Sequence, residues 1–164
     1  MSYDFERPQG SKDEIYQVVY KQIESLVEGE CDLIANMANV AAILHQSFGF
    51  WWTGFYRVLP KSLNGQDVEY ELVLGPFQGP VACMHIGYGK GVCGSSWKEK
   101  RTLLVPDVDL FPGHIACSSL SKSEVVVPLF KGEEVIAVLD IDSDKLATFD
   151  EIDQFWLEKI VKLL

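Results

Sequence analysis

Three cysteines lie close together in the sequence, on segments that suit neither a helix interior nor a strand interior. Cys83 and Cys93 belong to a stretch rich in glycine and proline, residues 75–94, and Cys117 follows on a segment that also contains proline and glycine. A cysteine reacts as its thiolate, and we expect Cys93 in the first turn of a short helix, where free N–H groups favour that form. A single cysteine is usually an inert buried thiol, and the clustering of three argues against that alternative.

The glycine-rich stretch itself is expected to form one wall of a site. Glycine lets backbone approach a ligand closely, and a helix that begins after residues 87–91 points its first N–H groups at whatever lies in front of it. The arrangement Gly-x4-Gly-Lys-Ser/Thr of nucleotide-binding loops is absent from this stretch. A small carboxylate would suit these N–H groups as well as a phosphate would.

Two aspartates supply a second chemical feature. Asp140 and Asp142 are two residues apart in a strand-like run, so their side chains should share one face and repel each other unless a cation or a shared proton is present. If the preceding hairpin has a three-residue loop, residues 131–133, Glu124 lies opposite Asp140; a two-residue loop would break this parity. A solvated strand edge is the alternative, and the apolar neighbours at 125–127 and 135–138 favour a buried, central hairpin instead.

Zinc binding is an alternative use of the same region. Two cysteines and two histidines, listed below, could supply sulfur and imidazole ligands. Nine residues separate the first two cysteines of the stretch, so the short-spaced cysteine pair of common zinc sites is absent. The sequence therefore favours zinc less than it favours thiol chemistry. The candidate ligands are Cys83, His85, His114 and Cys117.

Helices are expected at the two ends of the chain and hairpin-linked strands between them. Helices should run from a capping box at Ser11 to Gly29, from Asp32 to Gly49, over 92–100, and onward from a capping box at 148–151. Strands are expected over 50–59, 69–74, 102–105, 124–130 and 133–142, with an Asn-Gly turn at 64–65 and a long loop over 106–123. This order predicts an α+β fold, an antiparallel sheet with helices packed on it.

Composition narrows the class of protein further. The chain has 164 residues, 48% of them hydrophobic, which suits one domain over residues 1–164. A net charge of −10 disfavours nucleic acid and anionic membranes as partners. No signal peptide or long apolar run occurs, and four cysteines make no disulfide framework, so we expect a soluble, cytoplasmic protein.

Six motifs, read together and in order, resemble the free methionine-(R)-sulfoxide reductases, small proteins that consist of one GAF domain. The motifs are GPFQGPVAC, GKGVCG, VPDV, FPGHIAC, SEVVVPL and VLDIDS. The resemblance implies a GAF-like fold and reduction of free L-methionine (R)-S-oxide to methionine. In the implied reaction a cysteine becomes a sulfenic acid, an intramolecular disulfide then forms, and thioredoxin reopens it without a bound cofactor. The resemblance also implies a role in oxidative stress and a homodimer.

The resemblance also assigns roles to individual residues. It implies that Cys117 is the nucleophile, that Cys83 is the resolving cysteine and that Cys93 is a second candidate for that role. The substrate-binding residues that it implies are the acids Glu124, Asp140 and Asp142 and the aromatic residues Trp52 and Tyr56, which would contain the S-methyl group. The alternative from another class is a non-catalytic GAF sensor that binds a small ligand without turnover.

Overall fold

The computed structural model describes residues 6–61, 69–115 and 119–164, and these form an antiparallel sheet with helices on both sides. The strand order is β3-β2-β1-β6-β5-β4. The α+β fold expected from the sequence is confirmed. The strands are β1 (Trp52–Pro60), β2 (Tyr70–Gln78), β3 (His85–Ile86), β4 (Leu103–Val105), β5 (Ser123–Lys131) and β6 (Glu134–Ser143). The helices are α1 (Lys12–Val27), α2 (Leu33–Phe48), α3 (Gly91–Glu99), α4 (Glu151–Val161) and the short 3-10 helix η1 (Val108–Leu110).

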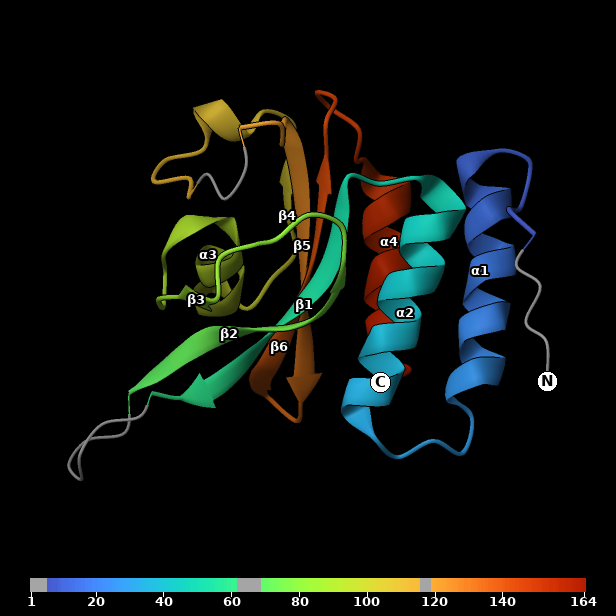
Figure 1. Ribbon diagram of the computed structural model, residues 1–164, viewed down its shortest axis with the longest axis horizontal. Helices are drawn as coiled ribbons and strands as arrows, with labels where there is room; N and C mark the ends of the chain where they lie inside the picture. The colour runs from blue at the N-terminus through green and yellow to red at the C-terminus, as the bar shows by residue number, and fades with distance from the viewer. Residues whose placement is uncertain (1–5, 62–68, 116–118) are drawn as a thin grey trace.

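The two sides of the sheet are built differently. Helices α2 and α4 cover one side with α1 outside them, whereas α3 and irregular loops cover the other side (Figure 1). Alternate residues of each strand face opposite sides. Val125 and Val127 accordingly join the core under the helices, and Val126 joins the core beside α3. The first core is called the helical side below, and the second the loop side.

Local capping residues set the ends of the first two helices where the sequence predicts them. The Ser11 side chain accepts a hydrogen bond from the Glu14 N–H, and Glu14 accepts one from Ser11 in return. Asp32 caps α2, which ends at Gly49 with a φ of 69°, a value that glycine adopts without strain. Both predictions are confirmed.

The predicted start of the last helix is wrong by two residues. Thr148 was expected to cap it, but the Thr148 hydroxyl donates to Ser143 Oγ at 2.7 Å. Asp150 forms the capping box with Asp153 instead. A threonine engaged with the preceding strand is no longer available to the helix, so the helix begins at the next suitable side chain.

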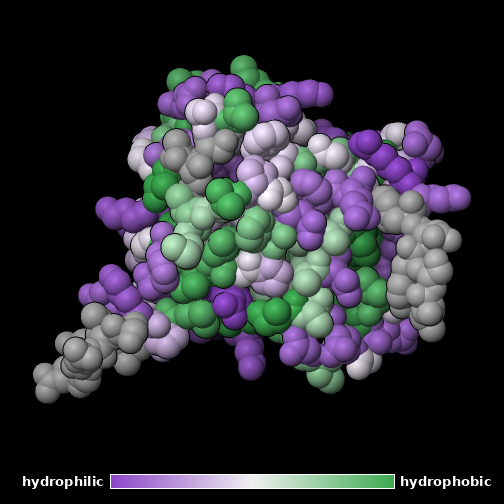
Figure 2. Space-filling model, in the orientation of Figure 1, coloured by the Kyte–Doolittle hydropathy of each residue, from purple (hydrophilic) through white to green (hydrophobic). Residues whose placement is uncertain are grey.

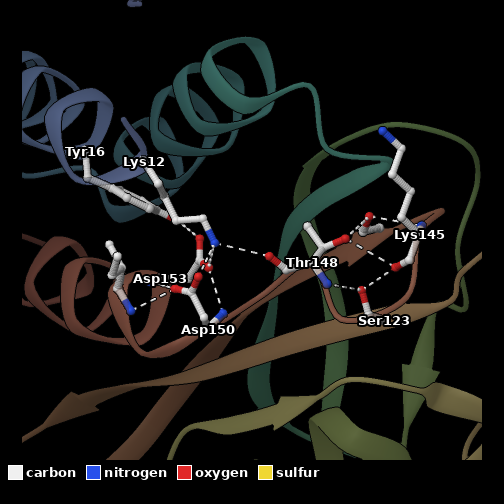
Figure 3. A network of polar contacts seen from close by, with 9 residues as sticks. Lys12, Tyr16, Ser123, Lys145, Thr148, Asp150 and Asp153 are labelled. Atoms are coloured by element: carbon white, nitrogen blue, oxygen red, sulfur yellow. Dashed lines mark hydrogen bonds and ion pairs between the residues drawn. The ribbon is translucent and has the colours of Figure 1, made fainter. Parts of the chain in front are cut away.

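A buried polar network joins the two ends of the chain on the helical side (Figure 3). Asp153 lies at its centre and is 1% exposed. It accepts hydrogen bonds from Lys12 Nζ at 2.6 Å, Tyr16 Oη at 2.7 Å and the Asp150 N–H at 2.8 Å. Both carboxylate oxygens therefore have partners, and the network fixes α1 against α4.

The β5–β6 hairpin is central and buried, as expected, but its predicted register is wrong. Its loop has two residues, because Lys131 pairs with Glu134. An extra residue in β6, Ile136, then shifts the register by one and restores the parity. Glu124 consequently lies opposite Asp142, and not opposite Asp140.

The outer hairpin on the other half of the sheet is β1 with β2. The two strands pair antiparallel as expected, and β2 extends further than predicted, to Gln78. The predicted Asn64-Gly65 turn lies outside the described residues. Within the described part of the chain, we find no helix that combines the length and the apolar character needed to cross a membrane.

Candidate functional site

Three carboxyl groups meet on the loop side of the sheet. Glu124, Asp142 and Trp52 lie side by side across strands β5, β6 and β1, and Asp140 lies in the next row. All four side chains line a single pocket. The predicted convergence of the two aspartates with Glu124 on one face is therefore observed, with Leu139 and Ile141 turned to the helical side.

A glycine makes room for the aromatic wall of this pocket. Gly54 lies opposite Asp140, and a Cβ atom there would come within 2.5 Å of the Trp52 ring and 2.4 Å of Phe77 Cβ. The Trp52 ring therefore lies over Gly54 and stacks on Tyr56, with ring centroids 5.9 Å apart.

The same two aromatic residues hold the loop that follows β2. Trp52 Nε1 donates to the Pro80 carbonyl at 3.0 Å, and Tyr56 Oη donates to the Cys83 carbonyl at 2.9 Å. Pro80, Val81 and Ala82 line the pocket as a consequence. The aromatic wall and the cysteine-bearing loop are thus one connected unit.

Two of the acids are buried in a way that favours their protonated form. Glu124 and Asp140 are each 6% exposed, and Asp140 Oδ1 has no hydrogen-bond partner. Burial raises the pKa of both carboxyl groups well above the usual range, and the charge on Asp142 raises both further. Both groups therefore favour the protonated form.

Asp142 differs because a hydroxyl group stabilises its charge. Ser121 Oγ donates to Asp142 Oδ1 at 2.5 Å. Burial raises the pKa of Asp142, the bond from Ser121 opposes the increase, and the result is a pKa of about 6. At neutral pH Asp142 is therefore mostly a carboxylate, beside two acids that favour the protonated form.

Cys93 lies in the first turn of α3, as predicted, but the expected preference for thiolate is wrong. Its sulfur is buried 4.0 Å from Glu124 Oε1. Burial raises the pKa of the Cys93 thiol well above its usual value, and the carboxyl groups of Asp140 and Glu124 raise it further. The helix N-terminus favours negative charge, but burial of the sulfur, together with the three acids opposite it, outweighs that effect.

The N-terminus of α3 opens onto the same pocket. Lys90 is the N-cap residue and makes no side-chain capping bond, and residues 90–93 all line the pocket. A Cβ atom on Gly94 would come within 2.4 Å of the Gly87 carbonyl, so glycine allows this turn to lie against the loop before it. The first N–H groups of α3 and the Lys90 ammonium can therefore receive an anionic group.

The cysteines fall into different chemical states. Cys83 is half-buried and disulfide-bonded, whereas Cys31 is free and exposed and Cys93 is free and buried. The predicted nucleophile, Cys117, lies outside the described residues.

The zinc ligands considered from the sequence do not come together among the described residues. Cys83 is disulfide-bonded, and His85 is exposed and bonded to Glu71 at 3.0 Å. The donor atoms that do cluster, within 4.8 Å of one another, belong to Cys93, Glu124 and Asp140. Because burial favours the protonated form of all three, a cation there would first have to displace protons.

The pocket also contains residues that sequence reasoning missed or used differently. His114 was considered only as a zinc ligand, yet its Nε2 lies 3.8 Å from Glu124 Oε2. Burial lowers the pKa of His114, which favours the neutral ring. Ser121, Trp51 and Lys90 were not singled out, and for Ser121 the sequence holds no signal, because its bond to Asp142 depends on how the loop folds.

Comparison with known proteins places this geometry in a family. A family model described as GAF domain matches residues 37–164. The chain is 56% identical to GAF domain-containing protein A of Dictyostelium discoideum, with all of this chain and 99% of that protein covered. It is 38% identical to the free methionine-R-sulfoxide reductase of Saccharomyces cerevisiae, over 94% of this chain and 86% of that protein.

A solved structure agrees with these sequence relatives. The X-ray structure of free methionine-R-sulfoxide reductase from Neisseria meningitidis, in complex with its substrate, superposes with a TM-score of 0.89. The two chains are 47% identical, and the match covers 99% of this chain and 93% of that one. The chain therefore belongs to the GAF-domain family of free methionine-R-sulfoxide reductases.

Proposed function

We propose that the protein reduces free L-methionine (R)-S-oxide to methionine with a cysteine thiolate. The observation that carries this proposal is the pocket itself, in which Asp142, Glu124 and Asp140 face an aromatic wall beside a disulfide-bonded cysteine. Membership in the reductase family supports the same substrate. Each chemical group of the substrate has a counterpart in the pocket.

The charged ends of the amino acid would be held at two separate places. The Asp142 carboxylate would pair with the substrate ammonium group, since Asp142 is the acid that is ionised at neutral pH. The substrate carboxylate would lie at the N-terminus of α3, near Lys90. Trp52 and Tyr56 would contain the S-methyl group.

The reaction would use the two protonated acids. The Cys117 thiolate attacks the sulfoxide sulfur, and the oxygen needs a proton as its bond to that sulfur breaks. Glu124 and Asp140, which favour their protonated forms, would supply it. Oxygen is transferred to the cysteine, which becomes a sulfenic acid while methionine leaves, so that the cysteine is oxidised and the substrate sulfur is reduced.

The resolving step would then form a disulfide. The Cys83 thiolate attacks the sulfenic acid of Cys117, an S–S bond forms and the oxygen leaves as water. The disulfide-bonded state of Cys83 supports this assignment. Cys93 is a weaker candidate for the resolving role, because burial disfavours its thiolate. Two electrons from thioredoxin would restore both thiols without a bound cofactor.

The proposed binding mode restricts the substrate to the free amino acid. Both the ammonium and the carboxylate groups would be bound inside the pocket, and a peptide chain would have to continue through one of these two positions. Methionine sulfoxide within a polypeptide should therefore be refused. The N-acetyl and amide derivatives of methionine sulfoxide should likewise be poor substrates.

The experiment that tests this function measures methionine formed from each isolated sulfoxide epimer, with NADPH, thioredoxin and its reductase. We expect turnover of the R epimer only, and complete loss of turnover in Cys117→Ser. Cys31→Ser is the matched control and should retain full activity, because Cys31 is exposed and free, and lies before α2. Saturable binding of the substrate without any methionine formation would contradict the proposal and favour a sensor.

We also propose that residues 1–164 form one cytoplasmic GAF domain. Helix α1 packs on α2 and α4, and the Asp153 network joins α1 to α4. These contacts between the two ends of the chain support a single domain. The free cysteines among the described residues, Cys31 and Cys93, are typical of a reducing compartment.

A further inference from the structure

Apolar side chains are unusually exposed on the two segments that border the site. In the loop after β2, Val81 is 89% exposed and Met84 is 68% exposed. In the segment after β4, Leu110 is 80% exposed. Together with Ile115 and Leu120 from the same segment, these residues are called the apolar rim below. Side chains of this kind gain free energy when another surface covers them.

The apolar rim borders the pocket, and one residue from each of its two segments lines it. Val81 from one segment and Ile115 from the other both line the pocket, so the two segments face each other across it. Figure 2 shows hydrophobic side chains gathered in the middle of the face where Figure 1 draws the loop after β2 in front of the sheet.

The rim also differs in charge from the rest of the molecule. Residues 79–84 and 110–115 contain no aspartate, glutamate, lysine or arginine, in a chain whose net charge is −10. A partner that docks here therefore meets an uncharged apolar surface and need not approach like charges at close range.

Cys83 lies inside this rim, between Val81 and Met84, and its chemistry identifies the partner. The sulfur is disulfide-bonded and half-buried. Disulfide exchange requires that an incoming thiolate reach a disulfide sulfur directly. Any macromolecule that delivers that thiolate must place its own surface against the residues on either side of Cys83.

We propose that the apolar rim is the docking surface for a protein dithiol, which reopens the Cys83 disulfide after each turnover. This inference rests on the proposed function, since only the catalytic cycle generates the disulfide repeatedly. A small thiol could enter without covering the rim, and so the exposure of five apolar residues around one cysteine favours a protein.

The exchange proceeds in two balanced steps. A thiolate of the docked protein attacks the Cys83 sulfur, a mixed disulfide forms, and the sulfur previously bonded to Cys83 leaves as a thiolate. The second thiol of the partner, as its thiolate, then attacks the partner's sulfur in the mixed disulfide and expels Cys83 as a thiolate. The partner ends as a disulfide, and this protein has gained two electrons.

The test replaces rim residues that do not line the pocket, in Met84→Glu and Leu110→Glu. Ile34→Glu is the matched control, because Ile34 is an exposed aliphatic residue of α2 on the helical side. Three quantities are measured for each variant: methionine formed in a single turnover without reductant, turnover driven by dithiothreitol, and kcat/KM for thioredoxin supplied with NADPH and its reductase.

We expect the two rim variants to lose about tenfold in kcat/KM for thioredoxin, the effect of burying a misplaced charge at an interface. Their single-turnover yield and their dithiothreitol-driven rate should match those of the unsubstituted protein, and Ile34→Glu should match it in all three measurements. Equal kcat/KM for thioredoxin in the rim variants and the control would overturn the docking surface. Absence of methionine in the single turnover of the unsubstituted protein would instead overturn the proposed function.

Discussion

Two buried aspartates, one on each side of the sheet, show how differently the same residue type is used. Asp153 on the helical side has partners for both carboxylate oxygens, supplied by Lys12, Tyr16 and a backbone N–H (Figure 3). Asp140 on the loop side is almost as buried, but its Oδ1 has no partner among the described residues. A fully bonded buried acid stabilises a fold, whereas an incompletely bonded one costs stability and is available to a ligand.

The largest expected effect comes from Asp140→Asn. The change removes a proton donor and keeps the shape of the side chain, so kcat/KM for methionine sulfoxide should fall by roughly 10²- to 10⁴-fold. The free energy of unfolding should stay the same or rise, because a buried ionisable group is lost. Steady-state kinetics and urea unfolding measure the two quantities. Loss of stability with retained activity would assign Asp140 to the structural class of Asp153.

Asp153→Ala should show the opposite pattern. It leaves the Tyr16 hydroxyl and the Lys12 ammonium without their shared partner, so the free energy of unfolding should fall by about 3 kcal/mol. Activity per folded molecule should be unchanged, because Asp153 lies on the other side of the sheet. Asp144→Ala, a change at an exposed acid, is the control and should alter stability by less than about 0.5 kcal/mol.

The third prediction concerns the pH dependence of the loop side, where Asp142 titrates. The KM for methionine sulfoxide should rise about tenfold between pH 7 and pH 5, because Asp142, with a pKa of about 6, loses its charge. Its folded pKa lies above the usual 3.8, so its contribution to stability is complete below that value and is lost as pH rises through about 6. Asp142→Asn should remove both dependences, measured by kinetics and by unfolding across this range.

Asp150 on the helical side should respond to pH in the reverse direction. Burial opposes ionisation there, but the ammonium group of Lys12 and the backbone N–H groups of Ile152 and Asp153 together outweigh it and lower the pKa of Asp150 below its usual value. Its contribution to stability is therefore present above that usual value and lost as pH falls through the lowered one. The free energy of unfolding is measured for Asp150→Asn and for the unsubstituted protein across the acid range. The same pH dependence in both proteins would contradict this prediction.

The smallest expected effect comes from Ser121→Ala. Without the hydroxyl that donates to Asp142, the pKa of Asp142 should rise, and the midpoint of the KM profile should move upward by less than about one pH unit. Ser119→Ala, a change at an exposed serine of the same segment, should leave the midpoint in place. An unchanged midpoint in Ser121→Ala would mean that the hydroxyl does not stabilise the Asp142 charge.

The helical side could be predicted from sequence almost completely, because its signals are local. Ser11 and Asp32 cap the starts of α1 and α2, and Gly49 ends α2, each through contacts with residues a few positions away. The shared face of Asp140 and Asp142 could also be predicted, since the period of a strand is two residues. These features need no knowledge of the rest of the fold.

The details of the loop side depend on contacts between distant segments, and there the predictions failed. The helix N-terminus at Cys93 is visible in the sequence, but the acids that raise the pKa of its thiol come from β5 and β6. The Ser121 hydroxyl meets Asp142 only because a long segment folds back over the sheet. Charge and hydrogen bonding in a site are thus tertiary properties, even where the residue types are obvious.

The additional residue in β6, near the hairpin tip, sets the register that brings Glu124 into the distant pocket. If Ile136 were paired regularly, opposite Leu129, the register set by the tip would continue along the hairpin and Glu124 would lie opposite Ile141, whose side chain belongs to the core under the helices. A carboxyl group would then be directed into hydrocarbon, and the pocket would lose an acid although none had been mutated. Deletion of Ile136 should instead leave Glu124 opposite Asp142, because the pairs on either side of the extra residue would simply become consecutive.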